Sequence, residues 1–288
     1  MSGAHGPIIF ATAVLVNAST GTDRAPRRRA RVVWAALWTA LVWPLFVAVT
    51  ALTTSLWVVD PNYTETTPVS DLGFFALGAM IGAGFASQIR RRPPAAGVGQ
   101  SLLAAAALAL CGLLGSRVEP LVGGVVLTAA AVVLLVLHPQ PRGLLHARSN
   151  PSGVGAGLAL LAAAVGTGYA ALMIAAALDA GPSCFLGRCA HGDRLAELAA
   201  TALVIPALAA LAAWRVDGWR LPLWSAGLGA ITLGSSSTLL PHATGSFGVP
   251  GGVASMAWGV LLLGLGEHGR IHTRTTQRKA TQGEGEIA

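Results

Sequence analysis

Long apolar runs separated by short polar segments dominate this sequence. A membrane-spanning helix needs about 20 mostly apolar residues, because the hydrocarbon core is about 30 Å thick and a helix rises about 1.5 Å per residue. Eight runs approach or exceed this length: Val32–Val59, Leu72–Ile89, Val98–Leu114, Leu121–Leu137, Val154–Leu178, Leu195–Trp214, Leu221–Leu240 and Gly251–Gly266. The pattern predicts an all-α, polytopic membrane protein with eight transmembrane helices.

Few ionisable residues interrupt these runs. No Asp, Glu, Lys or Arg lies in the central part of a run, and Glu197 is placed at the membrane interface. We therefore divide the chain into a basic tail at 1–31, expected to be disordered, a transmembrane domain at 32–267 and a polar tail at 268–288.

The amino-acid composition also indicates that lipid surrounds part of the protein. Only 11% of the residues are charged and 53% are hydrophobic, whereas a soluble domain carries about 25% charged residues. The net charge is +7, but the arginines form short clusters between apolar runs instead of one face with interleaved aromatic residues. This distribution argues against a nucleic-acid partner.

The arginine clusters alternate along the chain. With the N-terminus in the cytoplasm, the outer segments hold only Arg117, Arg188 and Arg194 of the 19 Lys and Arg residues. Positive residues favour cytoplasmic loops, and an odd number of spans would invert the downstream loops. Lys279 is the one lysine among these 19 residues, and this bias towards arginine suggests a GC-rich bacterial genome. We therefore expect a bacterial plasma-membrane protein with both termini in the cytoplasm.

The two groups of four spans share loop features. Each has a longer outer loop after its first span and an arginine-bearing turn after its second. GSRVEPLVGG in the first group parallels GSSSTLLPHATGSFGVPGG in the second. Four is an even number, so a duplication would give a 4+4 parallel internal repeat about an axis along the membrane normal.

The outer loop GPSCFLGRCAHGD contains two cysteines, Cys184 and Cys189. Thiols oxidise outside the cytoplasm, so we expect a structural disulfide between them. One alternative is a redox pair, although the usual redox spacing is C-x-x-C. Another is a metal site that adds His191 and His242, and we expect no metal as the primary interpretation.

The run GSSSTLLPH contains the most polar part of any span. Its hydroxyls either bond to carbonyls one turn earlier or form a small polar pocket that opens outward. The residues of that predicted pocket are Ser235, Ser236, Ser237, Thr238, Thr167 and Tyr169. If the pocket carries flux, Ser236→Leu should abolish it.

Cofactor and catalytic motifs are absent from the sequence. His138 and His242 lie at opposite ends of their spans, so no histidine pair suits a b-type haem. No G-x-S-x-G, H-E-x-x-H, Walker A or dinucleotide-binding motif occurs in a fitting context. We expect no cofactor, no catalytic residues and no enzymatic activity.

Residues 215–260, RVDGWRLPLWSAGLGAITLGSSSTLLPHATGSFGVPGGVASMAWGV, and the turn VLHPQPRG at 136–143 carry a resemblance. They resemble the closing part of an uncharacterised family of multi-pass membrane proteins from high-GC Gram-positive (actinobacterial) bacteria. The resemblance covers about half of the chain. It implies lineage and membrane location, without an assigned activity.

The sequence therefore predicts an integral membrane protein of unassigned activity, acting as an accessory or scaffold subunit with a membrane-protein partner or as a homo-oligomer. The first alternative is a small-molecule permease or facilitator with a pocket near the Gly/Ser-rich seventh helix. The second is a membrane enzyme or redox partner that uses the outer cysteines, for which Cys184→Ser should destroy activity.

Overall fold

The computed structural model describes residues 24–59, 68–141, 153–180 and 190–285, and within these ranges it has eight long α-helices and no strand. The helices are α2 (Arg24–Val59), α4 (Pro68–Ser87), α5 (Ala95–Leu114), α6 (Val118–Leu137), α7 (Gly153–Asp179), α8 (Ala190–Ala213), α9 (Arg220–Leu239) and α10 (Gly248–Gly285). One helix corresponds to each predicted run, which confirms the all-α fold.

Several helices begin before the apolar run that predicted them. Helix α4 begins at Pro68 and α8 at Ala190, four and five residues earlier than expected. Their polar first turns contain Asp71 and Asp193, which favour a helix because a negative charge stabilises the positive end of the helix dipole. Helices α5 and α6, predicted from shorter runs, each reach 20 residues.

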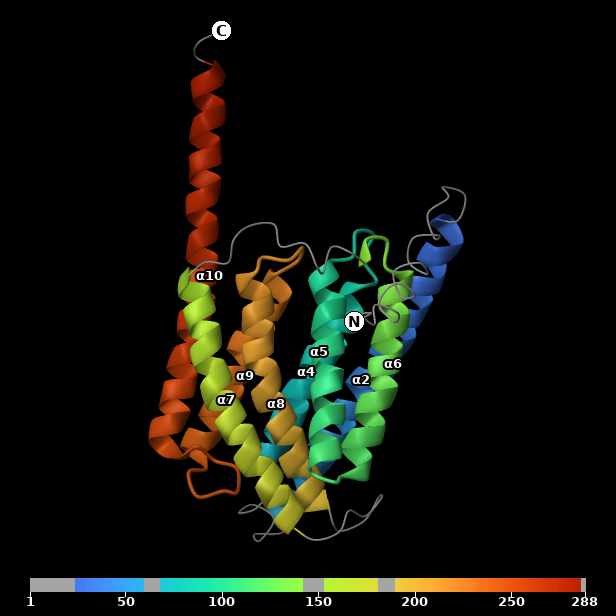
Figure 1. Cartoon of the computed structure of the whole chain (residues 1–288), viewed down its shortest axis with the longest axis vertical. Helices are drawn as coiled ribbons and strands as arrows, with labels where there is room; N and C mark the ends of the chain where they lie inside the picture. Colours follow the sequence, from blue (N-terminus) through green and yellow to red (C-terminus); the bar gives the residue numbers. More distant parts are fainter. Residues whose placement is uncertain (1–23, 60–67, 142–152, 181–189, 286–288) are drawn as a thin grey trace, which may run out of the picture.

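The two tails meet helices at different points from those predicted. Helix α2 begins at Arg24, inside the predicted basic tail, while residues 1–23 lie outside the described residues. Helix α10 continues to Gly285 through most of the predicted polar tail. It projects from the bundle as a single long rod (Figure 1).

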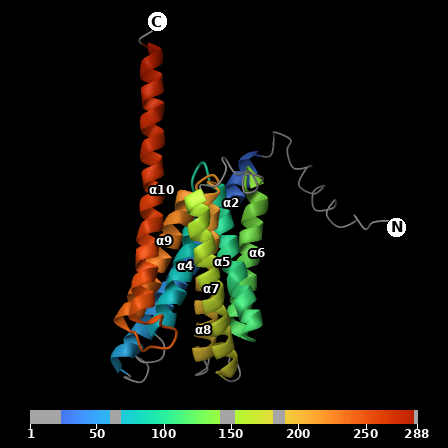
Figure 2. The same ribbon diagram turned by 60° about the vertical axis from the view of Figure 1, so that its left-hand side comes forward.

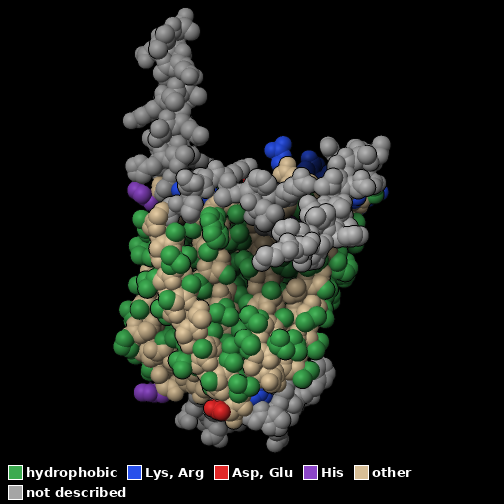
Figure 3. Space-filling model, in the orientation of Figure 1, with side chains coloured by type: hydrophobic (Ala, Val, Ile, Leu, Met, Phe, Trp, Pro, Cys, Tyr) green, Lys and Arg blue, Asp and Glu red, His purple; other side chains and the backbone are tan. Residues whose placement is uncertain are grey.

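Seven of these eight helices are long and apolar enough to cross a membrane, judged by length and composition. Helix α9 is the exception, because its polar Ser235–Thr238 run lowers its hydropathy. It still packs along the full bundle beside α10 (Figures 1 and 2). The side of the molecule is a broad apolar band, with charged side chains near its two ends (Figure 3). The chain is a multi-pass helical membrane protein.

Successive helices run antiparallel, so the start of α2 and the end of α10 share one end of the bundle (Figures 1 and 2). This end also carries the connections 88–94 and 214–219 with their arginines, and we name it the basic end. The opposite end carries the turns 115–117 and 240–247, and we name it the far end. That the basic end faces the cytoplasm stays a prediction.

Helices α4 and α8 form the centre of the bundle. In the most apolar stretch of each helix, 67% of the residues of α4 and 78% of those of α8 are buried, against 17% in α2, α7 and α10. The central pair is therefore enclosed by protein, while the outer helices present Val and Leu side chains to lipid.

Helix pairing in the first half (α2, α4, α5, α6) matches pairing in the second half (α7, α8, α9, α10). The contacts α2–α4, α4–α5, α5–α6 and α2–α6 correspond to α7–α8, α8–α9, α9–α10 and α7–α10. Between the halves, α4–α9 corresponds to α5–α8, and α4–α8 joins the two equivalent central helices. This is the pairing that a parallel repeat predicts, although the duplication itself stays a prediction.

Small residues allow close helix approach, as is typical in lipid. Gly78 and Gly82 form a G-x-x-x-G whose surface receives the rings of Phe46 and Trp43, and a Cβ on Gly82 would lie 2.7 Å from Trp43 Nε1. On α9, a Cβ on Gly234 would lie 2.5 Å from a carbonyl oxygen of α10. These glycines therefore serve packing within the chain.

Candidate functional site

A seam separates α7 from α10 in the second half, and α8 and α9 form its floor. The floor residues Ala202, Ala230 and Leu233 are buried. At the mouth of the seam Leu161 and Val165 are 58% and 62% exposed. Between floor and mouth lies a cavity of about 450 Å³, which we name the middle cavity. It falls within the usual range of about 300–1,000 Å³ for small-molecule sites.

Two aromatic contacts bridge the seam. At the far end, the Tyr169 hydroxyl donates a hydrogen bond to the Gly245 carbonyl oxygen, and its ring lies 4.4 Å from that of Phe247. Towards the basic end, Trp258 Nε1 on α10 donates to the Leu158 carbonyl oxygen on α7 at 3.3 Å. The middle cavity lies between these two bridges.

Proline shapes the floor of the middle cavity. Pro206 has no N–H, so the Ala202 carbonyl loses its usual donor one turn later in α8. That carbonyl faces Gly166 of α7, where a Cβ would lie 2.5 Å from its oxygen. All three residues line the cavity, and the absence of a side chain on Gly166 lets α7 approach α8 closely at this carbonyl.

A second cavity of about 230 Å³ continues the same seam at the basic end. Its residues include Gly155 of α7, Leu262 of α10, and Arg215 and Trp219 in the connection between α8 and α9. We name it the basic-end pocket. The basic-end pocket therefore places a cation and an indole next to the apolar middle cavity along the same seam.

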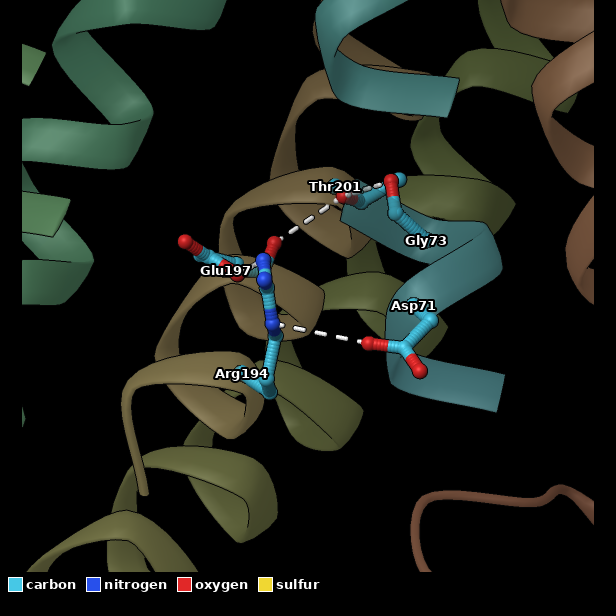
Figure 4. Close-up of polar contacts among 5 residues, drawn as sticks. All are labelled: Asp71, Gly73, Arg194, Glu197 and Thr201. Carbon is cyan, nitrogen blue, oxygen red and sulfur yellow. Dashed lines mark hydrogen bonds and ion pairs between the residues drawn. The ribbon is translucent and has the colours of Figure 1, made fainter. Parts of the chain in front are cut away.

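A separate cluster of ionisable side chains lies near the far end, between α4 and α8 (Figure 4). Arg194 reaches between two carboxylates, with Nη1 at 2.7 Å from Glu197 Oε2 and Nε at 3.5 Å from Asp71 Oδ1. Its guanidinium carbon lies 4.2 Å from the centre of the Phe74 ring. Asp71 and Glu197 are buried, so α4 and α8 are joined by ion pairs inside the bundle.

Thr201 extends this cluster towards the middle of the bundle. Its hydroxyl lies 3.1 Å from the Gly73 carbonyl oxygen on α4 and 2.9 Å from the Glu197 carbonyl oxygen on its own helix (Figure 4). A Cβ on Gly73 would lie 2.7 Å from Leu198 Cδ1. The two central helices therefore approach closely at the level of the ion pairs.

Arg117 lies close to the start of α8 at the same end. It is 2% exposed, and its Nη2 donates to the Ala177 carbonyl oxygen near the end of α7. A side chain at Gly192 would collide with its guanidinium. Both described arginines of the far end, Arg117 and Arg194, are thus held inside the protein, whereas Arg90, Arg91 and Arg92 at the basic end are exposed.

The cluster fits a role in joining helices. Neither of the two cavities described above is lined by Asp71, Arg194 or Glu197, and the described residues contain no group of three or more His, Cys, Asp or Glu that could hold a metal. A buried ion pair is costly to break, because removing one partner leaves an uncompensated charge. The cluster therefore fixes the register of α4 against α8.

The structure disperses the six residues of the predicted polar pocket. Ser235, Ser236 and Thr238 donate to the carbonyls of Thr232, Leu233 and Gly234 on their own helix. The Ser237 hydroxyl accepts the Phe247 N–H at 3.2 Å, and Thr167 is exposed on α7. Of the six, Tyr169 alone lines the middle cavity. Ser236 is buried away from it, so the flux prediction for Ser236→Leu loses its geometric basis.

The predicted cysteine pair lies outside the described residues. Cys184 and Cys189 fall in the range 181–189, so the disulfide stays a prediction. The described part of the chain contains one cysteine, Cys111, which is buried and free, as expected of a core residue. The His191 side chain is also outside the described residues, while His242 is exposed at the far end.

His138 occupies a buried position at the basic end of α6. Its Nδ1 accepts the Gln140 N–H at 3.1 Å, and its Nε2 lies 3.3 Å from the Pro93 carbonyl oxygen. These contacts assign the ring proton to Nε2. Burial lowers the pKa of His138 below its usual value, since desolvation disfavours the charged ring. The ring therefore joins the end of α6 to the α4–α5 connection.

No protein-family model, curated protein or solved structure matches this chain. The functional interpretation therefore depends on the geometry of the seam and of the ionic cluster.

Proposed function

We propose that this multi-pass membrane protein binds an amphiphilic molecule from the bilayer in the α7–α10 seam and acts as a permease or facilitator for it. The observation that supports this proposal is the middle cavity of about 450 Å³. Its mouth is formed by lipid-exposed side chains and its floor by buried ones.

The lining favours an apolar portion of the ligand. Its side chains are mainly Ala, Leu, Val and Gly, with Tyr169, Ser255 and Trp258 as the polar exceptions. Ser255 Oγ already donates to the Ala230 carbonyl oxygen at 2.9 Å. A hydrophilic solute would lose its hydration there without replacement hydrogen bonds, at a cost of about 2–7 kcal/mol for each polar group.

An accessory or scaffold function is the second candidate, and it would use the same seam. Small residues that line the seam on α7 and α10, Ala162 and Ala254, are of the type that lets a further transmembrane helix approach closely. Such a function predicts a stoichiometric membrane partner that covers the seam. A plasma-membrane location, cytoplasmic termini and an actinobacterial origin remain part of the proposal.

A matched pair of variants tests ligand transfer. Ala254 lines the middle cavity, whereas its neighbour Val253 points away from it and is 49% exposed. In proteoliposomes that contain a fluorescent phosphatidylglycerol, the wild-type protein should make inner-leaflet probe accessible to an external quencher. Ala254→Trp should abolish this transfer by filling the cavity.

Val253→Trp adds the same ring one residue away and should transfer probe like the wild type. Equal transfer by both variants would overturn the proposal. Absence of transfer by the wild type, together with a co-purifying protein that protects Ala254→Cys from labelling, would favour the scaffold function.

A further inference from the structure

We propose that the basic-end pocket binds the anionic headgroup of a lipid whose acyl chain occupies the middle cavity. This inference rests on the proposed function and adds the chemical class of the ligand. The two cavities are stacked along one seam, with Gly155 and Leu262 near the basic end and Leu161 and Ala254 deeper in the bundle. Headgroup and chain would therefore lie at the depths that they occupy in a bilayer.

Arg215 supplies the charge that selects this ligand. It follows the end of α8 with a φ of 48°, and its guanidinium carbon lies 5.9 Å from the centre of the Trp219 ring. No carboxylate among the described residues forms a salt bridge with it. Its planar fork of donors suits a phosphate group, so the lining of the pocket includes a cation that remains available to a ligand.

On α10, the acidic side chain between the pocket residues Gly266 and His268 is already paired. Arg220 donates to Glu267 Oε1 from Nε at 2.9 Å and from Nη2 at 2.6 Å, and Trp224 Nε1 donates to the same oxygen at 3.1 Å. Neutralised in this way, Glu267 offers little repulsion to an anion beside Arg215. Basic pockets between transmembrane helices are a recurrent type of site for anionic lipid headgroups.

Trp258 marks the boundary between headgroup and chain. Its bond to the Leu158 carbonyl oxygen crosses the seam between the two cavities. An acyl chain that extends from the basic-end pocket into the middle cavity must pass this indole. The ligand is thereby distinguished from free phosphate, which would fill the pocket without reaching Trp258 or the middle cavity.

The test measures which lipid the protein retains. Protein in vesicles of equal phosphatidylglycerol and phosphatidylcholine is extracted in mild detergent, and its bound lipid is quantified by native mass spectrometry. The wild type should retain phosphatidylglycerol about fivefold over phosphatidylcholine, the preference expected of one interfacial cation. Arg215→Gln should abolish the preference, whereas Arg91→Gln, which removes an exposed charge at the same end, should preserve it.

The outcomes separate the two proposals. If the wild type retains no lipid, or Ala254→Trp retains as much as the wild type, the cavity function fails. Suppose instead that the wild type retains lipid and Ala254→Trp does not, but the wild type shows no preference for phosphatidylglycerol. That result would overturn the headgroup assignment and leave the cavity function standing. So would displacement of the lipid by millimolar inorganic phosphate, or a dimer whose second copy protects the seam from labelling.

Discussion

The two halves of the bundle pair their helices in the same way but place different side chains between them. In the first half, aromatic rings fill the contact between α2 and α4: Trp38 stacks on Phe85 with ring centres 6.1 Å apart, and Phe46 stacks on Phe74 at 4.3 Å. In the second half, mainly Ala, Gly and Leu side chains surround the cavity of about 450 Å³ in the seam between α7 and α10. Large rings therefore pack the α2–α4 contact, whereas small side chains surround the middle cavity.

One bridge is common to both seams. In the first half Trp34 Nε1 on α2 donates to the Ala130 carbonyl oxygen on α6 at 3.1 Å. In the second half Trp258 Nε1 on α10 donates to the Leu158 carbonyl oxygen on α7 at 3.3 Å. Both bonds link the outermost helices of a half, so they hold the seam width while neighbouring side chains decide whether the seam is filled.

The largest expected effect comes from separating the halves at the α4–α8 contact. Arg194→Met leaves the buried carboxylates of Asp71 and Glu197 without their shared cation. We expect the free energy of unfolding to fall by about 3–5 kcal/mol, measured by denaturant titration in mixed micelles. Arg92→Met removes an exposed charge and serves as the control. A loss below about 1 kcal/mol for Arg194→Met would show that the ion pairs do not join the halves.

A smaller loss of stability is expected from removing a ring from the α2–α4 contact. Phe46→Ala removes the ring that stacks on Phe74 and covers Gly78. Such changes cost about 3–5 kcal/mol in water-soluble cores, but lipid tails are as apolar as the core. We therefore expect a loss of about 2 kcal/mol by the same titration. An unchanged unfolding midpoint would mean that the aromatic filling does not distinguish the two halves.

The length of the apolar runs predicted the helices well, because a spanning helix must be apolar along its whole length. It did not predict the ionic cluster. Asp71, Asp193 and Arg194 lie just before the apolar runs. They are nevertheless helical, because α4 and α8 begin four and five residues before those runs. The acidic residues at two helix starts and the spacing of Arg194 and Glu197 were the available signals. The contact between α4 and α8 depends on the tertiary structure, so it cannot be predicted from either apolar run alone.

Of the two alternatives for the Ser235–Thr238 run, the structure favours hydroxyls that bond to carbonyls one turn earlier. Polarity pointed to the Ser235–Thr238 run, but hydroxyls in a helix satisfy themselves on carbonyls one turn earlier. The cavity instead forms where small residues, among them Gly166 of α7 and Ala254 of α10, line the seam. The sequence analysis identified Tyr169 because its hydroxyl is polar. A cavity lined by small apolar residues has no comparable signal in a single sequence.

Adding a ring to the middle cavity should raise stability, whereas removing the Phe46 ring should lower it. Ala254→Trp places a ring in the middle cavity, and cavity filling commonly stabilises a protein by about 0.5–2 kcal/mol. We expect a gain near the lower end of that range in lipid-free micelles, read from the thermal unfolding midpoint. A large destabilisation would indicate that the cavity is smaller or more rigid than described.

The hydrogen bond of Tyr169 at the far end of the seam should contribute less to stability. Tyr169→Phe removes the hydroxyl that donates to the Gly245 carbonyl oxygen and keeps the contact with Phe247. Interhelical hydrogen bonds in membranes contribute about 0.6 kcal/mol, so stability should change little. Hydrogen exchange of the 240–247 turn should nevertheless accelerate in the variant. Unchanged exchange there would show that the bond does not close the seam.

The smallest effect concerns the basic ends of α6 and α10, the corresponding helices of the two halves. His138 is buried at the end of α6, whereas His268 on α10 is exposed. Because the pKa of His138 is lowered in the folded protein, the unfolded chain binds its proton at higher pH. The contribution of His138 to stability is complete above about pH 6.5 and declines as the pH falls.

Acidification from pH 7.5 to 5.5 should therefore lower the unfolding midpoint of the wild type more than that of His138→Gln, which keeps a donor for the Pro93 carbonyl oxygen. Equal pH dependence of the two proteins would contradict the burial of His138.

A density map of the protein in nanodiscs that contain phosphatidylglycerol would test the central claim most directly. We predict an elongated non-protein density that runs from Arg215 past Trp258 into the middle cavity, with no such density between α2 and α4, where aromatic rings pack. A second-half seam closed by its own side chains, or covered by another copy of the chain, would contradict the account.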